Sequence, residues 1–237
     1  MTESPLQRIA FRPVRSGNMY EETIERILQA IALGVLQPGQ QLPPERELAS
    51  LLNISRVTLR DALRSLQESG YVESRPGRHG GTFVLRTRPK SAGRRVPLPT
   101  AEQAQGYLDM RWIIERGACE FAAARQLSQE QQATLKAVLS DCSKATRGNY
   151  RQCDSRLHLT IAELSGVPSV AALVAENRDK LNRLLDSFPL LPPNLSHSNR
   201  QHEQIVDAIA LGDAAGAVAA MEQHMRGTAA LIHGFLA

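Results

Sequence analysis

Apolar residues recur at helical spacing along most of the chain, but the front part also carries turn and strand signals. Its apolar runs are short and are separated by Gly, Pro and Asn, which is typical of a small domain with tight connections. We expect three helices over residues 19–33, 42–52 and 56–68, and two short strands over 71–74 and 82–85. Pro44 suits an early position in the second helix, Asn53-Ile54 suits a turn, and Ser55 suits the N-cap of the third helix.

The back part is expected to be purely helical, because strong helical periodicity starts near Ala101 and no strand pattern interrupts it. The expected helices cover 102–126, 128–146, 149–165, 168–187, 198–211 and 214–235. Residues 188–196, FPLLPPNLS, are expected to form a loop. The predicted fold class is therefore mainly α: an N-terminal winged helix-turn-helix (three helices plus a β-hairpin), followed by an all-α antiparallel helical bundle.

Composition along the chain predicts four segments. Residues 87–100, TRPKSAGRRVPLPT, are basic and Pro-rich without an apolar period, so we interpret them as an interdomain linker. Residues 1–17 are expected to be a flexible arm, residues 18–86 the winged helix-turn-helix domain, and residues 101–237 the helical domain.

Composition also restricts the class of protein. No apolar run approaches the ~18–20 residues that cross a bilayer, and the N-terminus lacks the features of a secretory signal. The three cysteines, Cys119, Cys142 and Cys153, have no C-x-x-C spacing, which favours a reduced, cytoplasmic protein. Residues 1–100 hold 15 Lys/Arg against 9 Asp/Glu, whereas residues 101–237 hold 13 against 15. The excess of positive charge thus lies in the front part, as attraction to phosphate requires.

The third helix has an arginine face. Arg56, Arg60 and Arg64 recur every four residues and share one side, with Thr58 near the same end. The opposite side is expected to pack on the first two helices through Val57, Leu59, Ala62, Leu63 and Leu66. Such a stripe by itself is more often a solvated surface. Its place after a helix-turn and before a basic hairpin favours a helix that lies in the DNA major groove.

Further basic residues flank that helix. Arg46 in the second helix is placed to touch the DNA backbone, and the hairpin tip adds Arg75, Gly77 and Arg78. Glycine allows the backbone of the tip to approach DNA closely, and the cations suit phosphate or the adjacent groove.

The helical domain contains polar residues on apolar helix faces. Asp154 and His158 fall on one stripe with Leu157 and Ile161, while His202 and His224 lie on the apolar faces of two later helices. Buried polar groups without partners cost ~1–3 kcal/mol each, so these groups are expected to serve a shared purpose. Three imidazoles and a carboxylate suit a divalent metal such as zinc. Spacing alone still favours the simpler interpretation, a local Asp154–His158 pair and separate, satisfied histidines.

The front segment LPPERELASLLNISRVTLRDALRSLQESGYVESRPGRHGGTFV closely resembles the winged-helix domain of the GntR family of bacterial transcription regulators. The phrases LPPERELA, SRVTLRDAL and GTFV are specific in combination. The resemblance implies that Arg46, Ser55, Arg56, Thr58, Arg60 and Gly77 lie at the DNA.

The back segments RWIIERGACEFAA, the D-x-x-x-H of Asp154 to His158, and QHEQIVDAIALGDAAGAVAAMEQHM resemble the helical FCD effector domain of the FadR-like branch. Members of this branch that carry metal use an Asp and three His at these positions. The resemblance therefore implies a divalent metal at Asp154, His158, His202 and His224, with zinc expected and nickel or another transition metal as alternatives. Arg111 opens the R-x-x-x-E phrase, and either pairs with Glu115 or faces the pocket and binds an effector carboxylate.

The resemblance implies a homodimeric transcription regulator, more often a repressor in this family, that binds a palindromic double-stranded operator. A small carboxylic acid at the metal is expected to control this binding. Two alternatives stay open at the level of sequence: a metal-dependent enzyme fused to a DNA-binding module, and a constitutive DNA-binding protein with a structural metal. We expect no enzyme, because no general base beyond the ligands and no nucleophile motif is recognisable.

Overall fold

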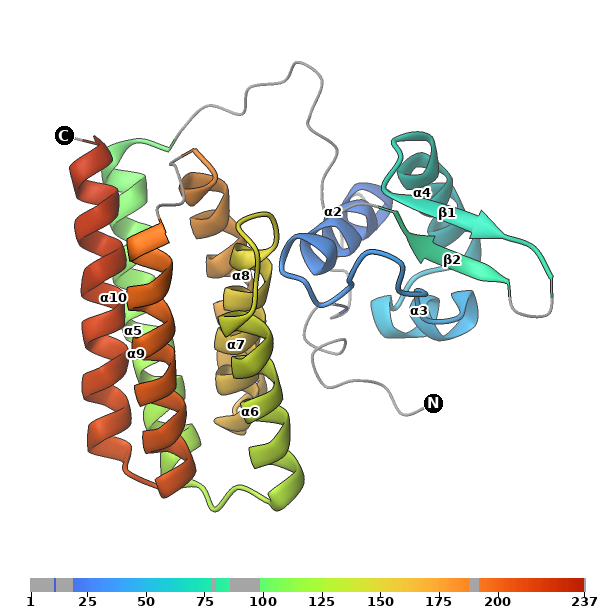
Figure 1. Cartoon of the computed structure of the whole chain (residues 1–237). Coiled ribbons are helices and arrows are strands. Elements are labelled where there is room, and N and C mark those ends of the chain that lie inside the picture. Colours follow the sequence, from blue (N-terminus) through green and yellow to red (C-terminus); the bar gives the residue numbers. More distant parts are fainter. Residues whose placement is uncertain (1–10, 12–18, 78–79, 86–98, 188–191, 237) are drawn as a thin grey trace. The chain divides into compact units, whose positions relative to one another are not determined.

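The protein forms two compact units, Met1–Val96 and Pro97–Ala237. In the computed structural model (Figure 1) the described residues are 11, 19–77, 80–85, 99–187 and 192–236. The predicted arm and linker fall almost wholly outside these residues. The exception in the arm is Phe11, which is buried.

The first unit has the order predicted for a winged helix-turn-helix, and that prediction is confirmed. Its elements are α2 (Met19–Ala32), α3 (Glu45–Leu52), α4 (Arg56–Glu68), β1 (Val72–Arg75) and β2 (Gly81–Val84). The two strands pair antiparallel, with Val72 opposite Val84, and both valines are buried. The side chain of Tyr20 in α2 hydrogen-bonds that of Ser65 in α4 at 2.6 Å, which ties the first helix to the third.

The turn between α3 and α4 follows from its residue types. Asn53 takes a left-handed conformation with φ 53°, which asparagine tolerates better than most residues. Ser55 then caps α4, since its hydroxyl oxygen accepts a hydrogen bond from the Thr58 backbone N–H at 3.0 Å. The prediction for α3 was wrong at its start: the helix begins at Glu45, and Pro44 has extended backbone. Pro43 precedes a proline and is therefore pushed out of the helical region, which explains why the helix does not begin at Leu42 or Pro43.

The second unit consists of long helices, as predicted. They are α5 (Ala101–Ala124), α6 (Gln129–Ser143), α7 (Tyr150–Leu164), α8 (Pro168–Leu185), α9 (Pro192–Leu211) and α10 (Ala214–Leu236). Capping boxes start α5 at Thr100 and α6 at Ser128. In Figure 1, α5, α9 and α10 lie on one side of the bundle, and α6, α7 and α8 on the other.

The interpretation of 188–196 as a loop was wrong in its second half. α9 begins at Pro192, six residues earlier than predicted, while 188–191 lie outside the described residues. Proline has no N–H to donate and a φ suited to the first helical turn, so Pro192-Pro193 starts this helix.

Substitution of Ser55 tests whether its N-cap stabilises α4. Replacing Ser55 by Ala removes the cap and should lower the free energy of unfolding by about 1 kcal/mol. Ser55→Asn keeps a capping oxygen and should retain most of that stability. Chemical denaturation of both variants and of the unchanged chain checks this, and an equal loss in both variants would argue against the cap.

Candidate functional site

The arginine face of α4 is exposed, as its spacing predicts. Arg56, Arg60 and Arg64 all face solvent, while Leu59, Ala62, Leu63 and Leu66 are buried. The expectation for Val57 was wrong, because its side chain is 69% exposed. Val57 is two residues from Leu59, which on a helix places it about 200° away, outside the packed face.

Acidic partners accompany two of the basic residues. The Nε of Arg60 lies 2.8 Å from Oε2 of Glu45 in α3, in a solvent-exposed ion pair. Arg75 in β1 pairs with Glu73 and lies over the Phe83 ring, 4.3 Å from its centre. Neither acidic partner was foreseen from the sequence.

The remaining predicted DNA-facing residues are in accessible positions where they are described. Arg46 in α3 is exposed, and Thr58, two residues after Arg56 in the first turn of α4, is half-buried. Gly77 at the hairpin tip is exposed with φ 106°, a conformation that favours glycine. Arg78 lies outside the described residues.

Within the second unit, the four candidate metal ligands converge. Asp154 and His158 come from α7, His202 from α9 and His224 from α10. Each offers one ligand atom, and these atoms lie within 4.8 Å of one another. The three imidazoles are buried, and the ring centres of His202 and His224 are 4.6 Å apart. The simpler interpretation, separate histidines, therefore does not describe this arrangement.

Each histidine has a neighbour at its Nδ1 atom. These neighbours are Glu115 Oε2 at 2.7 Å from His158, Cys142 Sγ at 3.8 Å from His202 and Gln201 Oε1 at 3.3 Å from His224. The His158–Glu115 contact is short but poorly directed for a hydrogen bond, and it partly offsets the lowering of the His158 pKa by burial.

The Nε2 atoms of His158 and His202 are buried and make no well-directed hydrogen bond, but they lie 3.8 and 3.2 Å from Oδ1 of Asp154. Metal-bound histidines commonly use one ring nitrogen for the ion and the other for a supporting group. The donor set, in which both of these Nε2 atoms face the Asp154 carboxylate, therefore fits a divalent metal held by Asp154, His158, His202 and His224.

A buried ion network surrounds these residues. Arg178 of α8 pairs with Asp154, and its Nη1 lies 3.7 Å from Glu115 Oε1. Glu115 also accepts from the Nε of Arg111 at 3.1 Å. The predicted alternative in which Arg111 pairs with Glu115 thus occurs, and Arg111 also lines the cavity described below.

Arg178 was missed from the sequence, although a signal existed. It lies on the buried stripe of α8 formed by Ala171, Val174, Leu181 and Leu185. The criterion that singled out His158, a polar residue on an apolar face, applies to Arg178 as well.

Burial and the neighbouring charges set the protonation of the site. Burial by itself raises the pKa of Asp154, but Arg178 and the adjacent imidazoles outweigh it and hold that pKa well below its usual value. Burial lowers the pKa of His158 to about 4, against the opposing effect of Glu115. Burial also lowers the pKa of His224, and the nearby His202 adds to this. An ionised carboxylate and neutral imidazoles are the forms that bind metal.

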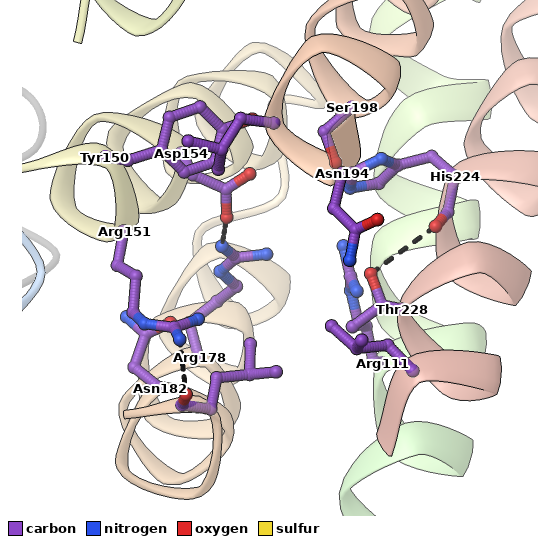
Figure 2. A pocket seen from close by; sticks show the side chains of 13 residues that line it. Arg111, Tyr150, Arg151, Asp154, Arg178, Asn182, Asn194, Ser198, His224 and Thr228 are labelled. Atoms are coloured by element: carbon purple, nitrogen blue, oxygen red, sulfur yellow. Dashed lines mark hydrogen bonds and ion pairs between the residues drawn. The ribbon is translucent and has the colours of Figure 1, made fainter. Parts of the chain in front are cut away.

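A cavity of about 70 Å³ opens beside these residues. Figure 2 shows Asp154, Arg178 and Asn182 on one side of it, and Arg111, His224 and Thr228 on the other. The volume corresponds to roughly five water-sized groups. The Nη2 of Arg111 is buried and has no hydrogen-bond partner. This nitrogen is therefore free to donate a hydrogen bond to an acceptor atom of a bound ligand.

Comparison with known proteins shows which family the chain belongs to. Residues 19–84 match the model of the bacterial regulatory proteins of the gntR family, and residues 107–227 match the FCD domain. The chain belongs to the GntR family, with an FCD domain. It is accordingly a DNA-binding transcription regulator, and its relatives are regulators rather than enzymes.

Several relatives of this GntR regulator align over most of their length. The putative L-lactate dehydrogenase operon regulatory protein of Escherichia coli is 31% identical over 86% of this chain and 83% of its own. The putative HTH-type transcriptional regulator RmpR of Mycobacterium gastri is 30% identical, over 88% and 78% respectively. The HTH-type transcriptional repressor NanR of an Enterobacter species is 25% identical, over 99% and 93%.

Among solved structures, E. coli McbR/YncC shares the fold, with a TM-score of 0.57 and 18% identity over 93% of this chain and all of its own. Among the residues described for this GntR regulator, no helix is both long and apolar enough to cross a membrane.

The buried network predicts an unequal response to the loss of two glutamates in α5. Glu115→Gln leaves Arg111 and Arg178 short of a partner in the interior and should destabilise the helical unit by about 3 kcal/mol or more. Glu120→Gln removes only a solvent-exposed contact with Arg116 and should cost less than ~1 kcal/mol. Urea denaturation followed by circular dichroism compares the two, and similar small losses would contradict the assigned role of Glu115.

Proposed function

We propose that this GntR regulator is a homodimeric repressor that binds a palindromic operator, and that a small carboxylic acid at a metal in the FCD domain controls this binding. The observation that carries the proposal is a cavity lined by two of the four candidate metal ligands, Asp154 and His224, and by Arg111, whose Nη2 is buried without a hydrogen-bond partner.

The DNA-binding part of the proposal uses the exposed end of α4. Arg56 and Arg60 are placed to donate to guanine edges, and Ser55 and Thr58 to contact phosphate or base. The exposed Val57 beside them suits contact with a thymine methyl group. One chain carries one such helix, so two copies related by a two-fold axis would read two half-sites.

The flanking contacts would position the protein on the duplex. Arg46 and the hairpin residues Arg75, Gly77 and Arg78 are proposed to approach the DNA backbone or the adjacent groove. Arg60 would have to exchange or share its contact with Glu45 when it meets DNA, because that ion pair is exposed and weak.

The metal part of the proposal follows from charge balance. In the buried network, Arg111 and Arg178 are balanced by Glu115 and Asp154, and burial lowers the pKa of both His158 and His224, which favours their neutral forms. A bound divalent ion would therefore add positive charge that nothing nearby offsets. An anionic ligand would restore the balance, which favours a carboxylate over a neutral compound. Zinc fits the donor set, and nickel or another transition metal is an alternative.

The cavity also restricts the size of the acid. Its volume suits a molecule of a few non-hydrogen atoms, with a carboxylate reaching the metal or Arg111. One relative is named for an L-lactate dehydrogenase operon, so small hydroxy acids are the first compounds to test. To act as an effector, the acid must bind the DNA-competent and DNA-released states with different affinity. Such a regulator would act in the cytoplasm, where its operator is.

The arginine face yields the test of DNA binding. Arg56→Ala or Arg60→Ala should weaken operator binding by roughly 5- to 150-fold, since a bidentate base contact is worth ~1–3 kcal/mol. Arg147→Ala, at an exposed position in the helical unit, removes the same charge and should have little effect. Fluorescence anisotropy at one fixed salt concentration measures the operator affinity of all three variants. Unchanged affinity in both α4 variants would contradict the proposal that α4 binds the operator.

Substitutions at the metal site test whether a metal-bound acid controls operator binding. The double variant His202→Ala, His224→Ala should lose its metal in elemental analysis, whereas His233→Ala, at an exposed histidine, should keep it. Small organic acids are then screened with zinc-loaded protein for release of the operator.

Arg111→Lys keeps the charge but removes the free Nη2, so it should retain metal and respond to the active acid at higher concentration only. Retained metal in the double variant would overturn the ligand assignment. If metal removal lowers stability while no acid changes DNA binding, the metal is structural and the control proposal fails.

A further inference from the structure

The side-chain amide of Asn182 in α8 is held in one orientation at the wall of the cavity. Its Nδ2 donates a hydrogen bond to Oγ of Ser155 at 2.8 Å, and the Ser155 hydroxyl donates to the backbone carbonyl of Arg151 at 2.8 Å. Because the hydroxyl proton is already used, Ser155 accepts from Asn182, and the nitrogen of the amide must face Ser155. The oxygen of the amide therefore lies on the side away from Ser155.

The Oδ1 atom of Asn182 is a buried hydrogen-bond acceptor without a donor. Asn182 lines the cavity and is only 7% exposed, and none of the described residues donates a hydrogen bond to its Oδ1. A buried acceptor that stays unpaired is costly, so almost all such atoms in folded proteins have a donor. A donor group that enters the cavity would supply the missing partner.

The cavity thus presents two groups of opposite kind. Figure 2 shows Arg111 on one side of it and Asn182 on the other. The Nη2 of Arg111 is a buried donor without an acceptor, and the Oδ1 of Asn182 is a buried acceptor without a donor among the residues that the structure describes. A ligand that satisfies both must carry an acceptor, such as a carboxylate, and also a hydrogen-bond donor. An unsubstituted carboxylate supplies only the acceptor.

The charges around the cavity indicate which kind of donor fits. Three guanidinium groups line it, those of Arg111, Arg151 and Arg178. Among the described lining residues the only carboxylate is that of Asp154, which already pairs with Arg178. An ammonium group would therefore be buried beside cations without a carboxylate of its own, which is costly. A hydroxyl group is neutral and small, so it suits this cavity of about 70 Å³.

We propose that Asn182 is the residue by which this regulator recognises a hydroxyl group on its acid effector, through a hydrogen bond from that hydroxyl to Oδ1 of Asn182. This rests on the proposed control by a small carboxylic acid, and it narrows that acid to a hydroxy acid rather than an unsubstituted acid, a keto acid or an amino acid. An acid without the hydroxyl would fill the cavity and leave Oδ1 unpaired, and a site built to bond a hydroxyl discriminates strongly against such a compound.

The first experiment compares acids that differ in one group. Isothermal titration calorimetry measures the affinity of the zinc-loaded chain for lactate and pyruvate, and for 3-hydroxypropionate and propionate. Lactate and pyruvate both carry a second oxygen that can reach a metal, but only lactate can donate a hydrogen bond. In at least one of the two pairs, according to which carbon places its hydroxyl at Asn182, the hydroxy acid should bind at least about 10-fold more tightly than the other acid.

The second experiment tests whether Asn182 causes this preference. Asn182→Leu removes the acceptor oxygen and should abolish the preference, whereas Asn182→Asp keeps an acceptor oxygen and should retain it while binding every acid more weakly. Asn177→Leu is the matched control on α8, because Asn177 is also buried but donates to the Tyr107 backbone carbonyl and is not among the residues that line the cavity. This control should keep the preference. Circular dichroism and metal analysis show whether each variant keeps its fold and its site.

The outcomes separate this inference from the proposed function. Equal affinities within both pairs overturn the role of Asn182 whether or not the variants fold, and they indicate that a water molecule serves its Oδ1. A preference that persists in Asn182→Leu also overturns it, because the hydroxyl is then bound by the metal. Both results leave the carboxylic acid effector standing. If none of the four acids binds, this inference fails, and if no acid of the wider screen binds either, the proposed control fails with it.

Discussion

Glu115 is the group on which the interior of the FCD domain depends. It lies on α5, is almost fully buried, and contacts Arg111 on its own helix, His158 on α7 and Arg178 on α8. Taking charges out of water costs several kcal/mol per ion, so the buried charges of Glu115, Arg111 and Arg178 are tolerated only while they are paired. Two carboxylates and two guanidiniums therefore form one balanced unit, and the helices that carry them must pack in one arrangement.

Within this balanced interior, some buried nitrogen atoms still lack a hydrogen-bond partner. The Nη2 atom of Arg111, a residue that lines the cavity, is buried without a hydrogen-bond partner, and so are the Nε2 atoms of His158 and His202 in the candidate metal-ligand set, atoms whose nearest charged neighbour is Asp154. A fold that satisfies most of its buried polar groups but leaves several in one region is suited to a ligand that completes them. Ligand binding at this place would act on α5, α7, α8 and α10 together, because residues of all four helices meet there. That is a physical route by which a small molecule could favour one packing of the domain over another.

Helix periodicity was enough to foresee most elements, because each amphipathic helix must bury one face whatever its partners are. It failed where local chemistry was ambiguous. Prolines were expected to delay α9, yet Pro192 starts it, and Pro44 was expected inside α3, yet the helix begins one residue later. Val57 was assigned to the packed side of α4, but helical geometry places it among the exposed residues. Each error concerns a residue whose type is compatible with two environments.

The sequence by itself determined the family, the two-part architecture and the residue types of the candidate site, because these follow from local spacing and from specific phrases. Only the tertiary structure decided that Asp154, His158, His202 and His224 meet, since they come from three helices separated by up to 70 positions. It also decided that Arg178 belongs with them and that Arg111 both pairs with Glu115 and faces the cavity. Spacing along a chain specifies which side of a helix a residue occupies, whereas the partners of that side depend on how the helices pack.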